Sequence, residues 1–276
     1  MQKFLYNFVT YFYILLILPI SALGENCSYN LKSATASISS NGVPLYVENS
    51  KFSKKILNKL KRRALKAKKK YNTINTKRCP ELTEQVNTLM ERLLTSSNLA
   101  FLLDNEDRLE VVLLCSKTDT PPVARIVAGK YLLIPASLPQ RAKSLDALAA
   151  VLSHEIAHYT LRHHARLLEE LNGRFPSGDR SFLNRIKRHH EKEADLTGLE
   201  LMTNAGFSPQ AAVSHLKHVK DFLDKRKHRV KAKGSHPSPT DRQLLLTEQI
   251  KKCSYRAIEK TANSTKVNPI HDSKKT

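Results

Sequence analysis

The sequence predicts an α+β protein that is mainly helical and contains a small sheet. Apolar residues recur at helical spacing through most of the chain, whereas only two short apolar runs have the composition of strands. Ser, Pro and Gly residues stand where such helices would begin and end. The 276 residues are 41% hydrophobic and 26% charged. This composition is enough to bury a core, and it excludes global disorder and a polytopic membrane protein.

Residues 1–24 have the pattern of a secretory signal peptide. Lys3 precedes an apolar stretch that is densest over residues 9–20, and the small-residue run Ala22-Leu23-Gly24 ends it. The alternative is an uncleaved anchor, because residues 4–23 are just long enough to span a bilayer. Cleavage would export the rest of the chain, which is then expected to be periplasmic or secreted.

Four cysteines follow the signal peptide. In an oxidising compartment an even number suggests two disulfides, with three pairings that the sequence leaves open, and the alternative is buried free thiols. The cysteines are Cys27, Cys79, Cys115 and Cys253.

Residues 25–78 are expected to form a polar arm and then a strongly basic amphipathic helix. Residues 51–70 include eleven basic residues and no acidic one, and their apolar residues recur at helical spacing. The whole chain has 46 Lys and Arg against 25 Asp and Glu, a formal charge of +21, which favours an anionic partner. Export argues against nucleic acid. The basic helix would therefore either lie on an anionic membrane surface, or pack its apolar stripe on the domain and leave its lysines in solvent.

Residues 79–260 are predicted to form one domain, and residues 261–276 a disordered basic tail. Capping and turn residues delimit its elements: Ser144 can begin a helix, Asn172-Gly173 can end it, and two later Ser-Pro pairs begin two more. The expected helices are Pro80–Ser96, Leu145–Leu171, Asp179–Asn204, Ser208–Lys225 and Ser238–Lys260, and the expected strands are Leu109–Cys115 and Ile126–Ile134.

One of these helices contains the motif HExxH, at residues 154–158. His154 and His158 are four residues apart, so they project from one helix face and both imidazoles can bind one zinc ion. Glu155 then stands beside the open position of the metal, where it can take a proton from water. The alternative is two surface histidines on an ordinary helix.

A catalytic zinc needs a third protein ligand, and the sequence offers two routes. The first is His164, but Leu161 stands where the extended motif has a glycine, and in an unbroken helix His164 would point about 80° away from His154. We therefore favour the second route, the segment ExxAD that begins at Glu191. Glu191 and Asp195 share a helix face, so one can bind metal while the other orients a histidine.

The residues next to these motifs are not expected to bind the metal. Glu193 is offset from the shared face and is expected to point into solvent. His163 and His164 are expected to be solvated or to lie behind the metal ligands. The alternative for the acidic cluster is that it only offsets the nearby charges of Arg185, Lys187 and Arg188.

A third element is His236-Pro237 with Arg242 six residues after His236. His236 could stabilise the oxyanion of a tetrahedral intermediate, or occupy the open position of the metal as a latch. Arg242 could pair with Asp195 or with a substrate carbonyl. The alternative is a turn histidine and a surface arginine.

Taken in order, HExxH, ExxAD beginning 33 residues after His158, and HPxxxxR resemble metallopeptidase family forty-eight, which holds the HtpX-like, BepA-like and CAAX prenyl endopeptidases. The match covers about residues 79–250. It implies a zincin-like (gluzincin) fold, and the soluble, exported BepA-like branch fits best. The resemblance implies one zinc ion held by His154, His158 and Glu191, with Glu155 as catalytic base, Asp195 beside the ligands, His236 as latch or transition-state group, and Arg242 as its partner.

The resemblance also implies a substrate-binding strand. Residues 126–134 would be an edge strand that pairs with an extended substrate through main-chain hydrogen bonds. The chain departs from the family here, because Ala128-Gly129 replaces a common Gly-Gly pair.

The sequence thus predicts an exported zinc metalloendopeptidase acting on protein or peptide substrates. Unfolded or misassembled cell-envelope proteins are the substrates that the family implies, which is a quality-control role. The alternative is a latched, weakly catalytic or chaperone-like binding protein that uses its basic surface on a membrane or on acidic clients.

Overall fold

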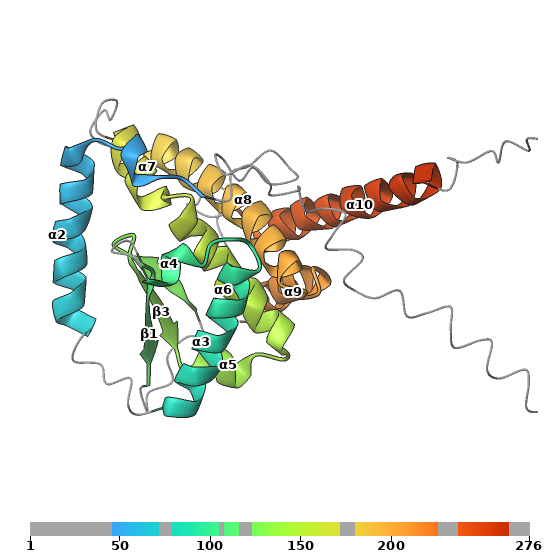
Figure 1. Ribbon diagram of the computed structural model, residues 1–276, viewed down its shortest axis with the longest axis horizontal. Coiled ribbons are helices and arrows are strands. Elements are labelled where there is room, and N and C mark those ends of the chain that lie inside the picture. The colour runs from blue at the N-terminus through green and yellow to red at the C-terminus, as the bar shows by residue number, and fades with distance from the viewer. Residues whose placement is uncertain are drawn as a thin grey trace, which may run out of the picture.

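The computed structural model describes residues 46–71, 79–104, 108–115, 123–171, 180–225 and 237–264 of the 276-residue chain. These residues are mainly helical with a small sheet, so the predicted α+β class is confirmed (Figure 1). The expected signal peptide, most of the polar arm, Cys27 and His236 lie outside the described residues.

The elements follow the predicted order, with shorter ones added between them. Residues 261–264, which were expected in the tail, belong to the last helix. The helices are η1 (Asn49–Lys51), α2 (Lys54–Tyr71), α3 (Pro80–Thr95), α4 (Phe101–Asp104), α5 (Ser137–Arg141), α6 (Leu145–Thr160), α7 (His163–Leu171), α8 (Arg180–Asn204), α9 (Gln210–Lys225) and α10 (Pro239–Ser264), and the strands are β1 (Glu110–Leu114), β2 (Arg125–Val127) and β3 (Tyr131–Pro135).

The described sheet has the strand order β1-β3-β2, parallel between β1 and β3 and antiparallel between β3 and β2. The prediction of a single strand over residues 126–134 was wrong, because this run is a hairpin. Its turn includes Ala128 and Gly129, with φ of 55° and 66°. Glycine adopts this conformation without steric cost, whereas alanine does so only where the surroundings require it. The hairpin places β2 at the edge of the sheet, against α6.

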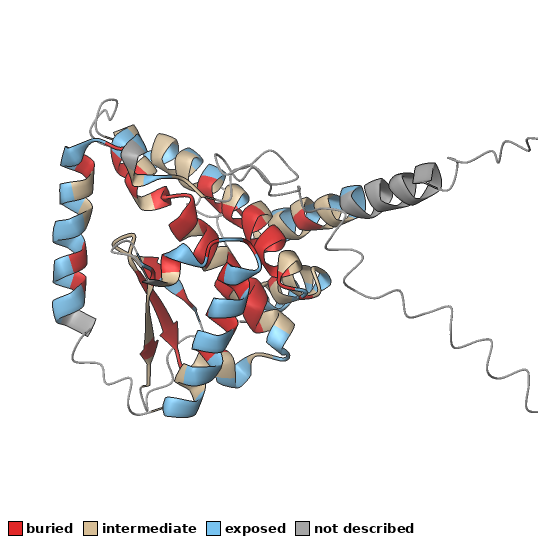
Figure 2. Ribbon diagram, in the orientation of Figure 1, coloured by how far each residue is buried: buried red, intermediate tan, exposed pale blue. Residues whose placement is uncertain are grey.

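The basic helix α2 lies along the sheet and α7 at one side of the molecule (Figure 1). Its buried stripe faces inward (Figure 2). Ile56, with Phe52 just before the helix, packs with Leu168 of α7, and Ala64 and Ala67 pack with two side chains of β3. The apolar stripe therefore packs on the domain, as one of the two interpretations held, and the basic side chains point into solvent.

The predicted helix over residues 145–171 is divided in two. Its start is as expected, because the Ser144 side chain accepts a hydrogen bond from the backbone of Ala147. However, α6 ends at Thr160, and Arg162 has φ of 53° before α7 begins. The segment before η1 secures this break, since the Val47 N–H donates to the Thr160 carbonyl at 2.8 Å and Nε of Arg162 donates to the Val47 carbonyl at 3.2 Å.

The core lies where α6 and α8 pack along each other, with α3 and the sheet on one side (Figure 2). A disulfide between Cys79 and Cys115 ties the start of α3 to the end of β1. None of the helices in the described ranges is long and apolar enough to cross a membrane. The main apolar contributions of α6 and α8 are Leu148, Leu152, Ile156, Ala157, Ala194, Leu201 and Met202.

Candidate metal centre

Two helices bring the three expected metal ligands together. His154 and His158 stand one turn apart on α6, and their Nε2 atoms are 3.2 Å apart. Glu191 reaches them from α8, with Oε2 3.6 Å from Nε2 of His154 and Oε1 3.6 Å from Nε2 of His158. The three side chains thus converge on one point between the helices, each with one ligand atom turned inward.

These spacings fit a zinc ion. Zinc binds nitrogen at about 2.0–2.1 Å in tetrahedral geometry, so neighbouring ligand atoms lie about 3.3 Å apart. The 3.2 Å between the two Nε2 atoms is close to this value, and each of the two Glu191 oxygens lies 3.6 Å from one of the histidines. Two histidines and one glutamate leave the fourth position for water or substrate, which is the ligand set of a catalytic zinc rather than a structural one.

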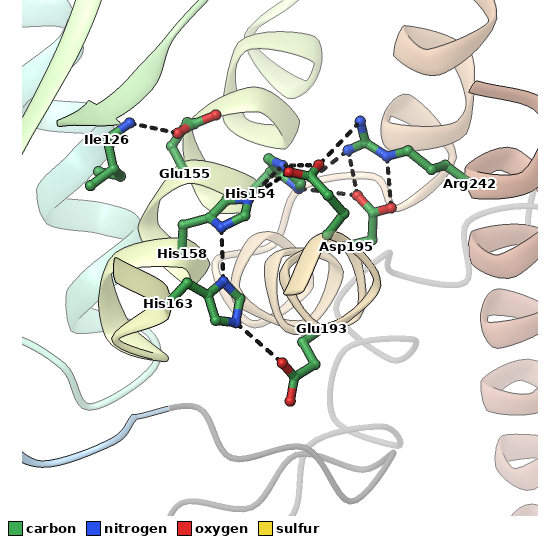
Figure 3. A network of polar contacts seen from close by, with 9 residues as sticks. Ile126, His154, Glu155, His158, His163, Glu193, Asp195 and Arg242 are labelled. Carbon is green, nitrogen blue, oxygen red and sulfur yellow. Dashed lines mark hydrogen bonds and ion pairs between the residues drawn. The ribbon is translucent and has the colours of Figure 1, made fainter. Parts of the chain in front are cut away.

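Asp195 fixes the orientation of the first histidine. Its Oδ1 lies 3.0 Å from Nδ1 of His154, which leaves Nε2 of that ring for the metal (Figure 3). Arg242, from α10, donates to both oxygens of Asp195 at 2.8 and 2.6 Å. Of the two partners that the sequence allowed for Arg242, the structure places it on Asp195. Because Asp195 is buried, this bidentate pair also supplies the cation that a buried carboxylate needs.

A glycine allows α8 to come this close to α6. A Cβ atom on Gly198 would lie 2.9 Å from both the Cα and the backbone nitrogen of His154, nearer than side-chain carbons approach a backbone. Gly198 is one turn after Asp195 on the same helix, so the same approach brings the carboxylates of α8 within reach of the histidines.

Glu155 lies between the metal ligands and the sheet edge. Its Oε2 accepts a hydrogen bond from the backbone N–H of Ile126, on β2, at 2.9 Å (Figure 3). Burial raises the pKa of Glu155 to about 7, against the lowering effects of His154 and of the Ile126 hydrogen bond. A carboxylate with a pKa near neutrality can both take up and release a proton, as a general acid–base group must.

The two candidate histidine ligands differ in their proton affinity. Burial and Arg242 act to lower the pKa of His154, but the acceptors Asp195 and Glu191 outweigh them and raise it to about 9. Burial, together with the charge of His154, holds the pKa of His158 well below its ordinary value. In the metal-free chain at neutral pH the proton therefore sits on His154, and a bound cation would displace it.

Comparison with known proteins agrees with this site. Residues 80–177, which contain His154, Glu155 and His158, match the model described as peptidase family M48. This segment is a peptidase family M48 domain. The zincin-like fold expected from the sequence is the fold of that domain.

Curated relatives of this chain are named as proteases. The beta-barrel assembly-enhancing protease of Yersinia pestis is 24% identical over 228 residues, covering 70% of this chain and 42% of the relative. The protein of the same name from Escherichia coli (strain K12) is 24% identical over 196 residues, covering 59% and 38%. A mitochondrial metalloendopeptidase of Schizosaccharomyces pombe is 30% identical over 148 residues, covering 47% and 42%. The chain spans about two fifths of the length of these relatives.

The site also includes side chains that the sequence interpretation placed in solvent, as for Glu193, or left open between solvent and a position behind the metal ligands, as for His163 and His164. Glu193 was expected to point away from the site, but its side chain is only 14% exposed and accepts two hydrogen bonds from Arg166, at 2.9 and 3.2 Å. His163 is buried, and its Nδ1 lies 2.8 Å from Nδ1 of His158. His164 instead packs against Gly129 in the β2–β3 turn. Spacing on a straight helix gave no signal for these positions, because the break at Arg162 determines them.

His215, on α9, is a further residue that the sequence interpretation missed. Burial, then the charges of Arg242 and His154, lower the pKa of His215 to about 4. It is therefore a neutral imidazole at neutral pH, within electrostatic range of Arg242 and His154. No spacing rule links a histidine in α9 to the motif in α6.

Proposed function

We propose that this chain is a zinc-dependent endopeptidase. The observation that carries the proposal is the convergence of His154, His158 and Glu191 at zinc-ligand spacing, with Glu155 beside them against the sheet edge. When bound there, zinc would supply a Lewis acid that makes a water molecule acidic and polarises a carbonyl group. The zinc specificity and the residue roles are part of this proposal.

The edge strand β2 is the proposed binding surface for substrate. Among the described strands β2 pairs only with β3, so its other edge can add an extended peptide through main-chain hydrogen bonds. The Ile126 N–H of β2 donates a hydrogen bond to Glu155. A peptide that pairs with this N–H takes the place of the Glu155 carboxylate there and lies next to the proposed base. Main-chain pairing gives affinity with little sequence preference, which suits unfolded substrates.

Glu155 is the proposed proton-transfer group of the reaction. Its carboxylate accepts a proton from the attacking water as the water oxygen bonds to the scissile carbonyl carbon. When the C–N bond breaks, the same group gives that proton to the leaving amine nitrogen. Asp195 and Arg242 keep His154 oriented throughout and exchange no proton with substrate.

The proposed substrates are unfolded or misassembled proteins of the cell envelope. This follows the name of the curated relatives, beta-barrel assembly-enhancing protease, and the signal-peptide pattern of residues 1–24. An envelope location is part of the proposal. It is tested by the cellular fraction in which the chain is found and by its N-terminal residue there, which is Glu25 if the segment is cleaved and Met1 if it is retained.

The deciding experiment compares Glu155→Gln with the wild-type chain on an unfolded test protein. Wild type is expected to cleave it when zinc is supplied, and Glu155→Gln to lose about 100-fold or more in kcat, because the group that moves the proton is gone. Glu169→Gln, an exposed substitution of the same type on α7, is the control and should cleave like wild type. Equal hydrolysis by wild type and Glu155→Gln would contradict the proposal. Retention of unfolded protein without cleavage by the wild type would favour the chaperone-like alternative.

We also propose that α2 binds an anionic lipid surface. The apolar stripe of α2 packs on the domain, whereas its basic side chains face solvent and make no contribution to that packing. No acidic residue interrupts this basic face. Such a face attracts anionic lipid head groups. The exposed basic side chains of α2 are Lys54, Lys55, Lys59, Lys61, Arg62, Arg63, Lys66, Lys68 and Lys69, and Lys51 of η1 precedes them.

Vesicle flotation tests this surface. The wild-type chain is expected to float with vesicles that contain phosphatidylserine and not with pure phosphatidylcholine. The triple replacement of Lys55, Lys59 and Arg62 by Glu should abolish flotation. The control variant carries three charge reversals at exposed positions of α9 and α10, with Lys217, Lys251 and Lys252 replaced by Glu. It should float like the wild-type chain. Equal loss in both variants would indicate a response to net charge and would contradict a role for α2.

A further inference from the structure

Behind the candidate ligand His158 lies a group of side chains that the proposed hydrolysis does not use. Nδ1 of His158 is 2.8 Å from Nδ1 of His163, and Nε2 of His163 is 3.3 Å from Oε2 of Glu193 (Figure 3). Arg166 donates to both oxygens of Glu193. The side chains of His163 and Glu193 are only 4% and 14% exposed, so water competes little for these contacts.

The positions of the ring hydrogens follow from the orientation of His158. Its Nε2 faces His154 and Glu191, and a metal bound on that side takes the lone pair of Nε2, which leaves the single hydrogen of the neutral ring on Nδ1. His158 therefore donates to Nδ1 of His163. The hydrogen of His163 is then on Nε2, on the side of the Glu193 carboxylate.

The break between α6 and α7 creates this contact. Residues five apart on a continuous helix lie about 140° apart around its axis and do not face each other. His163 faces His158 only because Arg162 adopts φ of 53° and α7 starts in a new direction. A residue other than glycine adopts this backbone conformation only where the surrounding structure requires it. Here that residue is Arg162, and the turn it forms lies directly behind the candidate metal ligand His158.

His163 and Glu193, together with His190, could also form a second metal site, but their geometry disfavours it. His163, His190 and Glu193 offer ligand atoms within 4.8 Å of one another, and Nε2 of both histidines has no aligned hydrogen bond. However, the two rings are stacked, with centroids 4.3 Å and planes 5° apart. No point lies in both ring planes, whereas a metal binds imidazole in the plane of the ring. Arg166 already holds both oxygens of Glu193 and would repel a second cation.

We propose that His163 and Glu193 are positioning residues for the metal ligand His158. They hold its imidazole by the Nδ1 hydrogen bond so that Nε2 points at the metal, as Asp195 and Arg242 do for His154 from the other side. The inference rests on the proposed zinc site. Loss of such an outer partner typically weakens metal binding by about 10- to 100-fold.

The test measures zinc binding and the ligand field, not hydrolysis. The zinc Kd of the full chain is measured by competition with a chromophoric chelator, and the cobalt-substituted chain is followed by its visible spectrum. His163→Phe keeps a buried ring and removes the acceptor, so Kd should rise about 10- to 100-fold and the cobalt bands should shift. Glu193→Gln should raise the zinc Kd and shift the cobalt bands in the same direction as His163→Phe, but less. If His163→Phe does not fold, Glu193→Gln tests the proposal in its place.

His190→Phe is the matched control. It keeps the ring stacked on His163 and removes ring nitrogens that do not face His158, so Kd and the cobalt spectrum should equal those of wild type. Unchanged Kd and spectrum in both His163→Phe and Glu193→Gln would overturn the proposal. Two zinc ions per wild-type chain and one per His190→Phe chain would also overturn it, in favour of the second metal site. Zinc bound with the expected Kd changes but without hydrolysis would contradict only the proposed function.

Discussion

At the scale of single residues, the candidate site depends on buried charges that have partners. The side chain of Asp195 is 3% exposed, orients His154 and is held by two hydrogen bonds from Arg242. The charge of Arg242 and the His154 hydrogen bond lower the pKa of Asp195 although burial raises it. Removing one partner of such a pair leaves an uncompensated charge in the interior, which costs more than the pair itself contributes.

We therefore expect Arg242→Ala to destabilise the metal-free chain by about 3–5 kcal/mol, because Asp195 loses its cation. The variant should also bind zinc more weakly, since Asp195 no longer holds His154 in one orientation. Urea unfolding followed by circular dichroism measures the first effect, and chelator competition the second. Lys251→Ala, an exposed change on the same helix, should alter neither. An Arg242→Ala chain as stable as wild type would contradict the pairing.

At the scale of elements, the site exists because two helices approach each other unusually closely. α6 carries the histidines and the proposed base, α8 carries the carboxylates, and Gly198 removes the side chain that would separate them. The packed apolar residues of both helices continue on either side of this contact, so dense core packing supports the close approach.

Gly198→Ala tests that approach. The added Cβ would lie 2.9 Å from His154 backbone atoms, so the helices must move apart, and we expect a loss of about 1–3 kcal/mol of stability as for other overpacked cores. The shift also moves Glu191 away from the histidines, so zinc Kd should rise. Lys192→Ala, at an exposed position of α8, gains helix propensity and should not lose stability. A Gly198→Ala chain with unchanged stability and Kd would show that the helices can adjust without cost.

At the scale of the whole molecule, the domain buries several imidazoles as neutral groups. Burial is the main cause for His190 and His215, whose pKa is lowered to about 4 in both cases. Their ordinary pKa is near 6.5. Between these values the unfolded chain binds protons that the folded chain does not, so stability is complete above pH 6.5 and falls as the pH drops towards 4.

We expect the free energy of unfolding of the metal-free chain to decrease through this window, by up to about 1.4 kcal/mol per pH unit for each such histidine. Urea unfolding at a series of pH values between 7.5 and 4.5, in chelator, measures it. Replacing both His190 and His215 by Phe should reduce the slope. A stability that is constant from pH 7 to pH 4.5 would contradict neutral burial of these side chains.

Part of the site was predictable from local spacing, because the relevant geometry repeats within one helix. Residues four apart share a face in any α-helix, so the pairing of His154 with His158, and of Glu191 with Asp195, needed no tertiary information. The capping of α6 by Ser144 was predictable for the same reason, since the cap bonds a backbone N–H three residues away.

The contacts that cross between elements were not predictable in this way. Leu161 is a good helix former, so the pattern favoured a continuous helix. In the structure Arg162 instead donates hydrogen bonds to the Val47 carbonyl and to the Tyr46 hydroxyl, which stabilise the break. Glu193 was expected in solvent because only its own helix was considered, whereas Arg166 of α7 lies against it. For Arg242 the sequence left two partners open, and α10 packing on α8 placed it on Asp195.

By itself the sequence determined which residues could bind a metal and which family the chain resembles, because the metal-binding motifs consist of residues at short, regular spacings. Only the tertiary structure decided how the site is held: the close approach at Gly198, the hairpin that puts β2 at the sheet edge, and the turn at Arg162 that brings His163 behind His158. Each of these depends on which surfaces pack together, and packing is a property of distant segments that local periodicity does not encode.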